Sequence, residues 1–185
     1  MDWLDETAAA VMTEDAYLEG YGVAVLLDER ERVRDVVPFR NLITDAGDLY
    51  YAGKAIAAIA PAAPAAPTAA TGMKLGTGLT AAAKNGAGAA LVTYLTGSNL
   101  PFDATYPQTA NLGAGLGVNA VYRTTWAAGV ATNAALAEVV LVNDSGTNAT
   151  SVAANTYHRA LFASTINKTA TDSLIVTWNA KFLGA

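Results

Sequence analysis

The residue best suited to acid–base or metal chemistry in this chain is its single histidine, His158. An imidazole changes charge near neutral pH and is the commonest protein ligand for metals. The surrounding sequence predicts a strand in which Arg159 follows directly, and no second type of metal ligand is placed nearby. We therefore expect His158 to be an outward-facing or packed strand residue, with no metal bound.

The carboxylates of the long segment 61–185 occur singly. A glycosidase needs two carboxyl groups held at a defined separation, and several of the acids outside this segment lie in a charge run typical of solvated surface. The four acids of 61–185 are Asp103, Glu138, Asp144 and Asp172. The sequence shows no assembled catalytic site, and we expect no enzymatic activity.

Two glycine-rich stretches, 76–78 and 113–117, invite comparison with nucleotide-binding loops. The first, GTGLTAAAK, lacks the Gly-Lys-Ser/Thr ending of a phosphate loop. The second, LGAGLGVN, neither follows a hydrophobic strand nor precedes a capped helix. The chain also contains no cysteine, which excludes disulfides and thiolate metal sites. We expect no cofactor.

Aromatic side chains offer one further kind of site, a surface on which a sugar ring stacks. Most of them fall at core-like strand positions, which favours packing in the core. Tyr106 lies in a proline-flanked loop, TYPQ, and is the one we expect to be exposed. The aromatic residues considered are Tyr94, Phe102, Tyr106, Tyr122, Trp126, Tyr157 and Trp178.

Charge is distributed unevenly along the chain. Residues 1–60 carry twelve acids and five bases, whereas residues 61–185 carry only four acids and six bases. Because the surface of a free soluble domain is usually about 25–35% charged, the second segment is typical of a surface that neighbours cover. The acidic N-terminal part lacks the basic clusters that bind phosphates, which argues against nucleic acid. No uninterrupted apolar run is long enough to span a membrane.

The first sixty residues predict an arm, a hairpin and a helix. Residues 21–28 and 32–39 predict a β-hairpin, with Pro38 at the end of its second strand or on an edge. Thr44 or Asp45 can cap a helix that Pro61 ends. Before them, residues 1–20 form an acidic arm, helical or extended, whose apolar residues need a partner to cover them. These apolar residues are Trp3, Leu4, Val11 and Met12.

An Ala/Pro-rich strap, residues 61–72, separates this part from the rest of the chain. Pro61, Pro64 and Pro67 recur at every third residue, which favours an extended polyproline II segment. In isolation such a segment is a spacer, and packed on a neighbouring subunit it is a strap. We therefore expect the arm and the strap to be contact elements.

Residues 73–185 are typical of a β domain. Residues 73–78 predict a short strand, 90–95 a helical turn and 97–117 a long ordered loop. Four strands then follow, over 118–128, 135–144, 156–164 and 173–183. The predicted fold class is mainly β, a β-sandwich or jelly-roll-like domain with one α-helix and an extended N-terminal arm. We expect one structural unit made of the arm 1–20, the hairpin and helix 21–60, the strap 61–72 and the sandwich 73–185.

The order of these segments resembles a recurring domain of tailed-bacteriophage virion proteins. The resemblance begins with N-x-I-T-x-A-G over 41–47, followed by G-T-G-x-T-x-A from Gly76. A strand with Glu138 comes next, then R-A-x-F over 159–162 and I-x-K-T-x-T-D-x-L-x-V-x-W over 166–178. The match covers about 41–183, whereas the strap and the acidic arm look specific to this chain.

This resemblance implies a non-enzymatic structural protein of a phage head or tail. We expect a decoration or minor capsid (cement) protein, located in the virion after assembly in the host bacterial cytoplasm. Its expected partners are the major capsid protein, copies of itself and other head or tail proteins, without nucleic acid or membrane. The expected contact residues are Trp3, Leu4, Val11, Met12, Pro61, Pro64, Pro67 and Tyr106. The alternatives are a tail or neck component and a host-glycan binding module that uses Tyr106.

Overall fold

The computed structural model describes residues 18–55, 67–114 and 117–182. In these residues nine strands form one antiparallel sheet in the order β4-β3-β7-β8-β2-β1-β9-β6-β5. The strands are β1 (Leu18–Leu27), β2 (Val33–Ile43), β3 (Gly72–Gly76), β4 (Leu100–Pro101), β5 (Gln108–Asn111), β6 (Val118–Trp126), β7 (Asn133–Val142), β8 (Thr156–Lys168) and β9 (Ser173–Phe182). The helices are α2 (Asp45–Ala55) and the short 3₁₀ helices η1 (Gly86–Ala89) and η2 (Ala153–Asn155).

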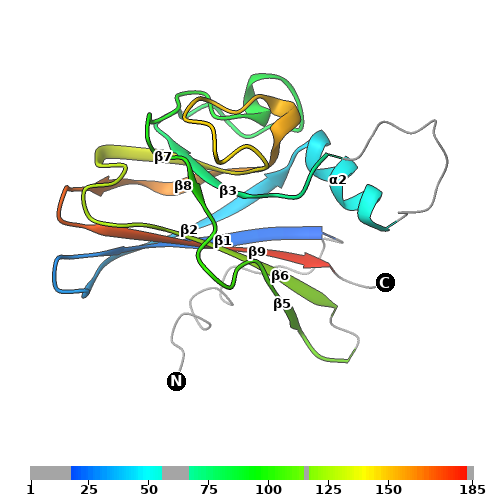
Figure 1. Cartoon of the computed structure of the whole chain (residues 1–185), viewed down its shortest axis with the longest axis horizontal. Coiled ribbons are helices and arrows are strands. Elements are labelled where there is room, and N and C mark those ends of the chain that lie inside the picture. The colour runs from blue at the N-terminus through cyan, green and yellow to red at the C-terminus, as the bar shows by residue number, and fades with distance from the viewer. Residues whose placement is uncertain (1–17, 56–66, 115–116, 183–185) are drawn as a thin grey trace.

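The sheet curls into two layers, as a β-sandwich does (Figure 1). One layer holds β4, β3, β7 and β8, and the other holds β2, β1, β9, β6 and β5. They join where residues 41–43 of β2 pair with residues 158–160 of β8. Side chains from both layers meet in one core. The mainly β fold class with one α-helix is therefore confirmed. Residues 1–17 of the predicted arm lie outside the described residues, whereas residues 18–20 belong to β1.

The four long strands expected in the second half of the chain are confirmed as β6 to β9. In β9, Leu174, Val176 and Trp178 alternate into the core and are fully buried, as a period of two requires. The predicted hairpin is also confirmed, because β1 and β2 pair antiparallel. Pro38 does not end β2. It lies where β2 has no hydrogen-bonded neighbour on its β8 side, which is an edge position.

Helix α2 begins where the sequence predicted. The Gly47 amide donates to the Thr44 hydroxyl over 3.1 Å, so Thr44 rather than Asp45 is the capping residue. A β-carbon on Gly47 would lie 2.2 Å from the Tyr157 carbonyl oxygen, which explains why this helix position is glycine. The helix consequently packs closely on β8, at the point where the two layers join. The expected end of the helix at Pro61 lies outside the described residues.

Two local predictions for the middle of the chain were wrong. Residues 90–95 form no helical turn, and the helical turn lies at η1 instead. The reason is that the backbone groups of 90–95 bond to other segments: the Leu95 amide donates to the Leu75 carbonyl, and the Thr93 carbonyl accepts from Thr77. The stretch 97–117 is not all loop, because it contains β4 and β5, which pair with β3 and β6.

Candidate functional site

Nearly all of the ten charged residues of 61–185 are buried or half-buried in the fold. Five are buried and four are half-buried, so that only Lys84 is exposed. The buried ones are Lys74, Glu138, Arg159, Lys168 and Asp172. Acids that stand singly in the sequence therefore belong to ion pairs or polar networks inside the fold. Two of these networks lie beneath two loop segments, residues 77–99 after β3 and residues 143–155 between β7 and β8.

The first network is the ion pair between Glu138 on β7 and Arg159 on β8. Both side chains are fully buried, and Arg159 Nη2 lies 2.7 Å from Glu138 Oε2. The alternation of β7 and β8 would place apolar residues at these positions. An ion pair here costs desolvation free energy that the mutual attraction often does not recover, so its other hydrogen bonds must be considered.

Those bonds fix the loop between β3 and η1 and the segment after η1. Glu138 Oε1 accepts from the amides of Gly78 at 2.9 Å and Thr93 at 2.9 Å. Arg159 donates to the carbonyl of Thr80 at 2.8 Å. Leu79 thus lies between Gly78 and Thr80, whose backbone groups are hydrogen-bonded to the buried pair. The pair turns an irregular loop into a rigid one.

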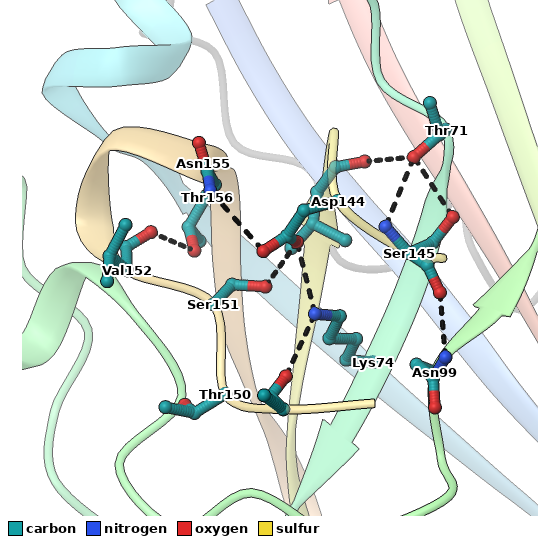
Figure 2. Close-up of polar contacts among 12 residues, drawn as sticks. Thr71, Lys74, Asn99, Asp144, Ser145, Thr150, Ser151, Val152, Asn155 and Thr156 are labelled. Carbon is teal, nitrogen blue, oxygen red and sulfur yellow. Dashed lines mark hydrogen bonds and ion pairs between the residues drawn. The ribbon is translucent and has the colours of Figure 1, made fainter. Parts of the chain in front are cut away.

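The second network, shown in Figure 2, fixes the loop between β7 and β8. Lys74 on β3 is fully buried, and its Nζ lies 3.1 Å from Asp144 Oδ1. It also donates to the Ala149 carbonyl at 2.9 Å. Asp144 in turn accepts from the Ser151 hydroxyl at 2.5 Å and the Asn155 amide at 3.4 Å. One buried cation therefore ties the loop to the sheet beneath it.

Residues 77–99 and 143–155, which we call the loop crown, form one surface. The two segments bond to each other, because Tyr94 Oη donates to Asn148 Oδ1 at 2.8 Å. Three of the five large apolar side chains that are exposed among the described residues lie in the crown. Their exposed fractions are 72% for Leu79, 60% for Val152 and 42% for Val92. In the crown, a backbone fixed by hydrogen bonds to buried side chains carries exposed apolar side chains. This arrangement is suited to protein contact.

His158 lies on β8 and is fully buried. Of the two expected alternatives, an outward-facing or a packed strand histidine, the structure shows the packed one. Its Nε2 lies 2.6 Å from the Tyr51 hydroxyl, and Asn41 contacts its Nδ1. Burial lowers the pKa of His158 to about 3, so the ring is neutral at physiological pH. Burial also raises the pKa of Tyr51. Both ring nitrogens have partners inside the core, and no group of metal-ligating side chains occurs among the described residues.

The structure places only two of the predicted contact residues. Pro67 is half-buried and lines a shallow depression with Leu49 and Ala153. Tyr106 was expected to be exposed, which was wrong: it is half-buried, because the Arg123 guanidinium lies 4.8 Å from its ring centre. The others, Trp3, Leu4, Val11, Met12, Pro61 and Pro64, lie outside the described residues.

Most of the aromatic residues considered for a sugar-binding face are core residues. Tyr122, Trp126, Tyr157 and Trp178 are buried, as the strand pattern favoured. Leu79, Val92 and Val152, by contrast, were not singled out by sequence reasoning. Their exposure follows from the geometry of the loops. The sequence offers one signal of it, because Leu79 lies in a turn of glycine and threonine residues, G-T-G-L-T from Gly76.

The Lys74 network leads to an asymmetric mutational prediction. Asp144→Ala should lower the free energy of unfolding by about 3 kcal/mol, because it leaves a fully buried ammonium group without its anion. Lys74→Met should cost less, about 1–2 kcal/mol, since Asp144 keeps its bonds to Ser151 and Asn155. Urea unfolding of both variants measures the difference. Equal costs would mean that the buried cation is not the critical member of the network.

In comparisons with protein-family models, with curated proteins and with solved structures, no match to this chain was found. Among the described residues, no helix has the length and apolar character needed to cross a membrane. The fold and the crown geometry are therefore the observations on which a proposal of function depends.

Proposed function

We propose that this protein is a non-enzymatic structural subunit of a tailed-phage particle, a decoration or minor capsid (cement) protein that binds the lattice of the major capsid protein. The observation that carries the proposal is the exposed surface of residues 67–182, where Lys84 is the one exposed charged side chain among the described residues. The other exposed residues there are mainly Ala, Thr, Gly and Asn. Charged residues are depleted at the centres of protein interfaces, and small side chains lose little entropy when they are covered.

The distribution of the remaining exposed charges supports an orientation. They gather on the β1–β2 turn and the adjoining part of β2, with others on α2. The charges on the β1–β2 turn are suited to solvent, whereas those on α2 adjoin the crown, where Asp48 pairs with Lys84. We propose that the apolar part of the loop crown contacts the lattice. Burial of Leu79, Val92 and Val152 against a partner would remove apolar surface from water, the dominant favourable term in protein association.

The crown makes the proposal testable by mutation. Leu79→Ser should weaken binding to particles that lack this protein by tenfold or more, because a central apolar contact commonly carries that much affinity. Val33→Ser is the matched control, since Val33 is exposed to 45% but lies on β2, outside the crown. Binding is measured by co-sedimentation with particles. Equal binding by both variants would remove the crown from the interface.

Electron cryomicroscopy of the intact particle tests the function itself. Density for this chain over the capsomers is the result we expect. Density restricted to the tail or neck would support the alternative position, for which the same charge-poor surface is suited. Absence of the chain from every particle would contradict both. A host-glycan module is a weaker alternative, because the Arg123 guanidinium lies over the ring of Tyr106, the residue expected to stack on a sugar.

A further inference from the structure

Among the described residues, strand β5 has a hydrogen-bonded neighbour on one side only. It is the last strand in the sheet order and pairs with β6 through residues 108–111 only. All four of its residues, Gln108, Thr109, Ala110 and Asn111, are exposed, and none is charged. An exposed strand edge presents unpaired amides and carbonyls that can pair with another strand. Figure 1 shows β5 next to β6 at the lower margin of the molecule.

Two other strand edges among the described residues, those of β2 and β4, are poorly suited to strand addition. The β2 edge carries Pro38, and Arg34, Asp35 and Arg40 are exposed along it. Proline and charged side chains are the usual means of blocking strand addition. This part of β2 also lies beside β8, because Phe39 contacts Phe162 with ring centres 5.7 Å apart.

Strand β4, at the other end of the sheet order, offers no useful edge either. It has two residues, and Pro101 has no amide to donate. Residues 161–168 of β8 and 134–137 of β7 also lack a hydrogen-bonded neighbour on one side, but these strands lie inside the sheet order. Of the two strands that end the sheet order, β5 is the one with an uncharged, proline-free edge along its whole length.

We propose that β5 pairs antiparallel with β5 of a second copy of this chain, so that the β2-β1-β9-β6-β5 layer continues into that of the partner. A second copy of this chain presents the same exposed, uncharged and proline-free edge at its own β5, so the two edges can pair with each other. Pairing of identical edges closes a two-fold dimer and leaves no edge free for further growth. The absence of charge avoids the like-charge repulsion that a two-fold axis would impose.

The two-fold symmetry defines which side chains meet. The axis that relates two antiparallel strands of one sheet is perpendicular to the sheet, so each residue and its copy lie on the same face. The two Ala110 side chains are therefore directly opposite or diagonal neighbours. Registers that keep each residue and its copy on the same face pair at most three residues of 108–111 from each copy. The ladder is therefore short, and we expect a weak dimer in solution, with a Kd of about 0.1–1 mM. Copies held side by side on a common surface would pair more completely, since their effective concentration is high.

Substitutions that introduce opposite charges at Ala110 test this pairing on the purified full chain. Sedimentation of the wild-type protein should show a monomer–dimer equilibrium. Ala110→Lys and Ala110→Asp should each weaken dimerisation by about tenfold or more at low salt, and a mixture of the two variants should restore it. Ala163→Lys and Ala163→Asp are the matched controls, because Ala163 is exposed on β8. Thermal melts followed by circular dichroism establish that the variants fold.

Hydrogen exchange gives a second readout that requires no mutation. Amides of 108–111 that point away from β6 should exchange more slowly as the protein concentration rises. A protein that sedimented as a monomer at all concentrations up to about 1 mM would overturn the proposal. So would a dimer that both Ala110 variants left intact, since its interface would then lie elsewhere. The test needs no particle, so its result is independent of the proposed virion function.

Discussion

Glu138→Gln is expected to lower the free energy of unfolding by about 3–5 kcal/mol, the cost of leaving a buried charge unpaired. The substitution would keep the shape of the side chain but remove the negative charge beside Arg159, whose guanidinium is fully buried. For a chain of this size the loss corresponds to a fall in Tm of about 6–20 °C. Thermal and urea unfolding measure it.

The exposed pair between Lys84 and Asp48 is the matched control. Both of its side chains are about half exposed, so Asp48→Asn should change the free energy of unfolding by about 0.5 kcal/mol or less. If the two substitutions had similar effects, the buried pair would not have the role that its geometry indicates.

A double variant, Glu138→Met with Arg159→Met, separates the charge from the loop contacts. Replacing a buried pair by apolar residues is often neutral or stabilising. Here it would also remove the partners of the Gly78 and Thr93 amides and the Thr80 carbonyl. We expect the double variant to remain destabilised, with faster hydrogen exchange in 77–93. Recovery of wild-type stability and exchange would show that the loop keeps its shape without the pair.

Acid should destabilise the protein through His158. Its folded pKa is about 3, below the ordinary value of 6.5, because burial disfavours the charged ring. Between these values the unfolded chain binds a proton that the folded chain does not, so the free energy of unfolding falls as the pH falls. The slope approaches about 1.4 kcal/mol per pH unit once the unfolded histidine is fully protonated. From pH 6.5 to about pH 4.5 the expected loss is therefore about 2 kcal/mol.

The measurement is urea unfolding across this pH range, with His158→Gln as the control. His158 is the single histidine of the chain. Hydrogen bonds lower the pKa values of Asp28 and Asp172, so these carboxylates stabilise the fold above the ordinary pKa of about 3.8 and lose that effect at lower pH. The glutamine variant should have a nearly flat profile between pH 6.5 and pH 4.5. An equal slope in both proteins would contradict the assignment to His158.

The buried networks also explain why a charge-poor chain retains the charges that it has. Glu138, Arg159 and Lys74 satisfy backbone groups of the crown loops, which carry no regular hydrogen-bonding partner of their own. An apolar residue at any of these positions would remove the hydrogen-bonding partner of those backbone groups. The charges thus give the crown a defined shape without adding charge to its surface.

Local patterns in the sequence determined much of the fold. The alternation of Leu174, Val176 and Trp178 specified a half-buried strand, because side chains alternate across a sheet with a period of two. Thr44 and Asp45, both capping residue types, indicated where the helix starts, and the structure identified Thr44 as the cap. The scarcity of charge after residue 60 was also evident, and with it the expectation of a covered surface. These properties depend on residues close together in the chain.

Only the tertiary structure decided which distant residues meet. Glu138 and Arg159 lie on adjacent strands, and their contact depends on the register between β7 and β8, which alternation alone does not specify. Lys74 and Asp144 likewise come together through pairing of β3 with β7. Strands β4 and β5 are too short to show a period and exist through pairing with β3 and β6. Composition therefore indicated a protein to be covered by neighbours, whereas non-local pairing placed its charges inside and formed the crown and the open edge.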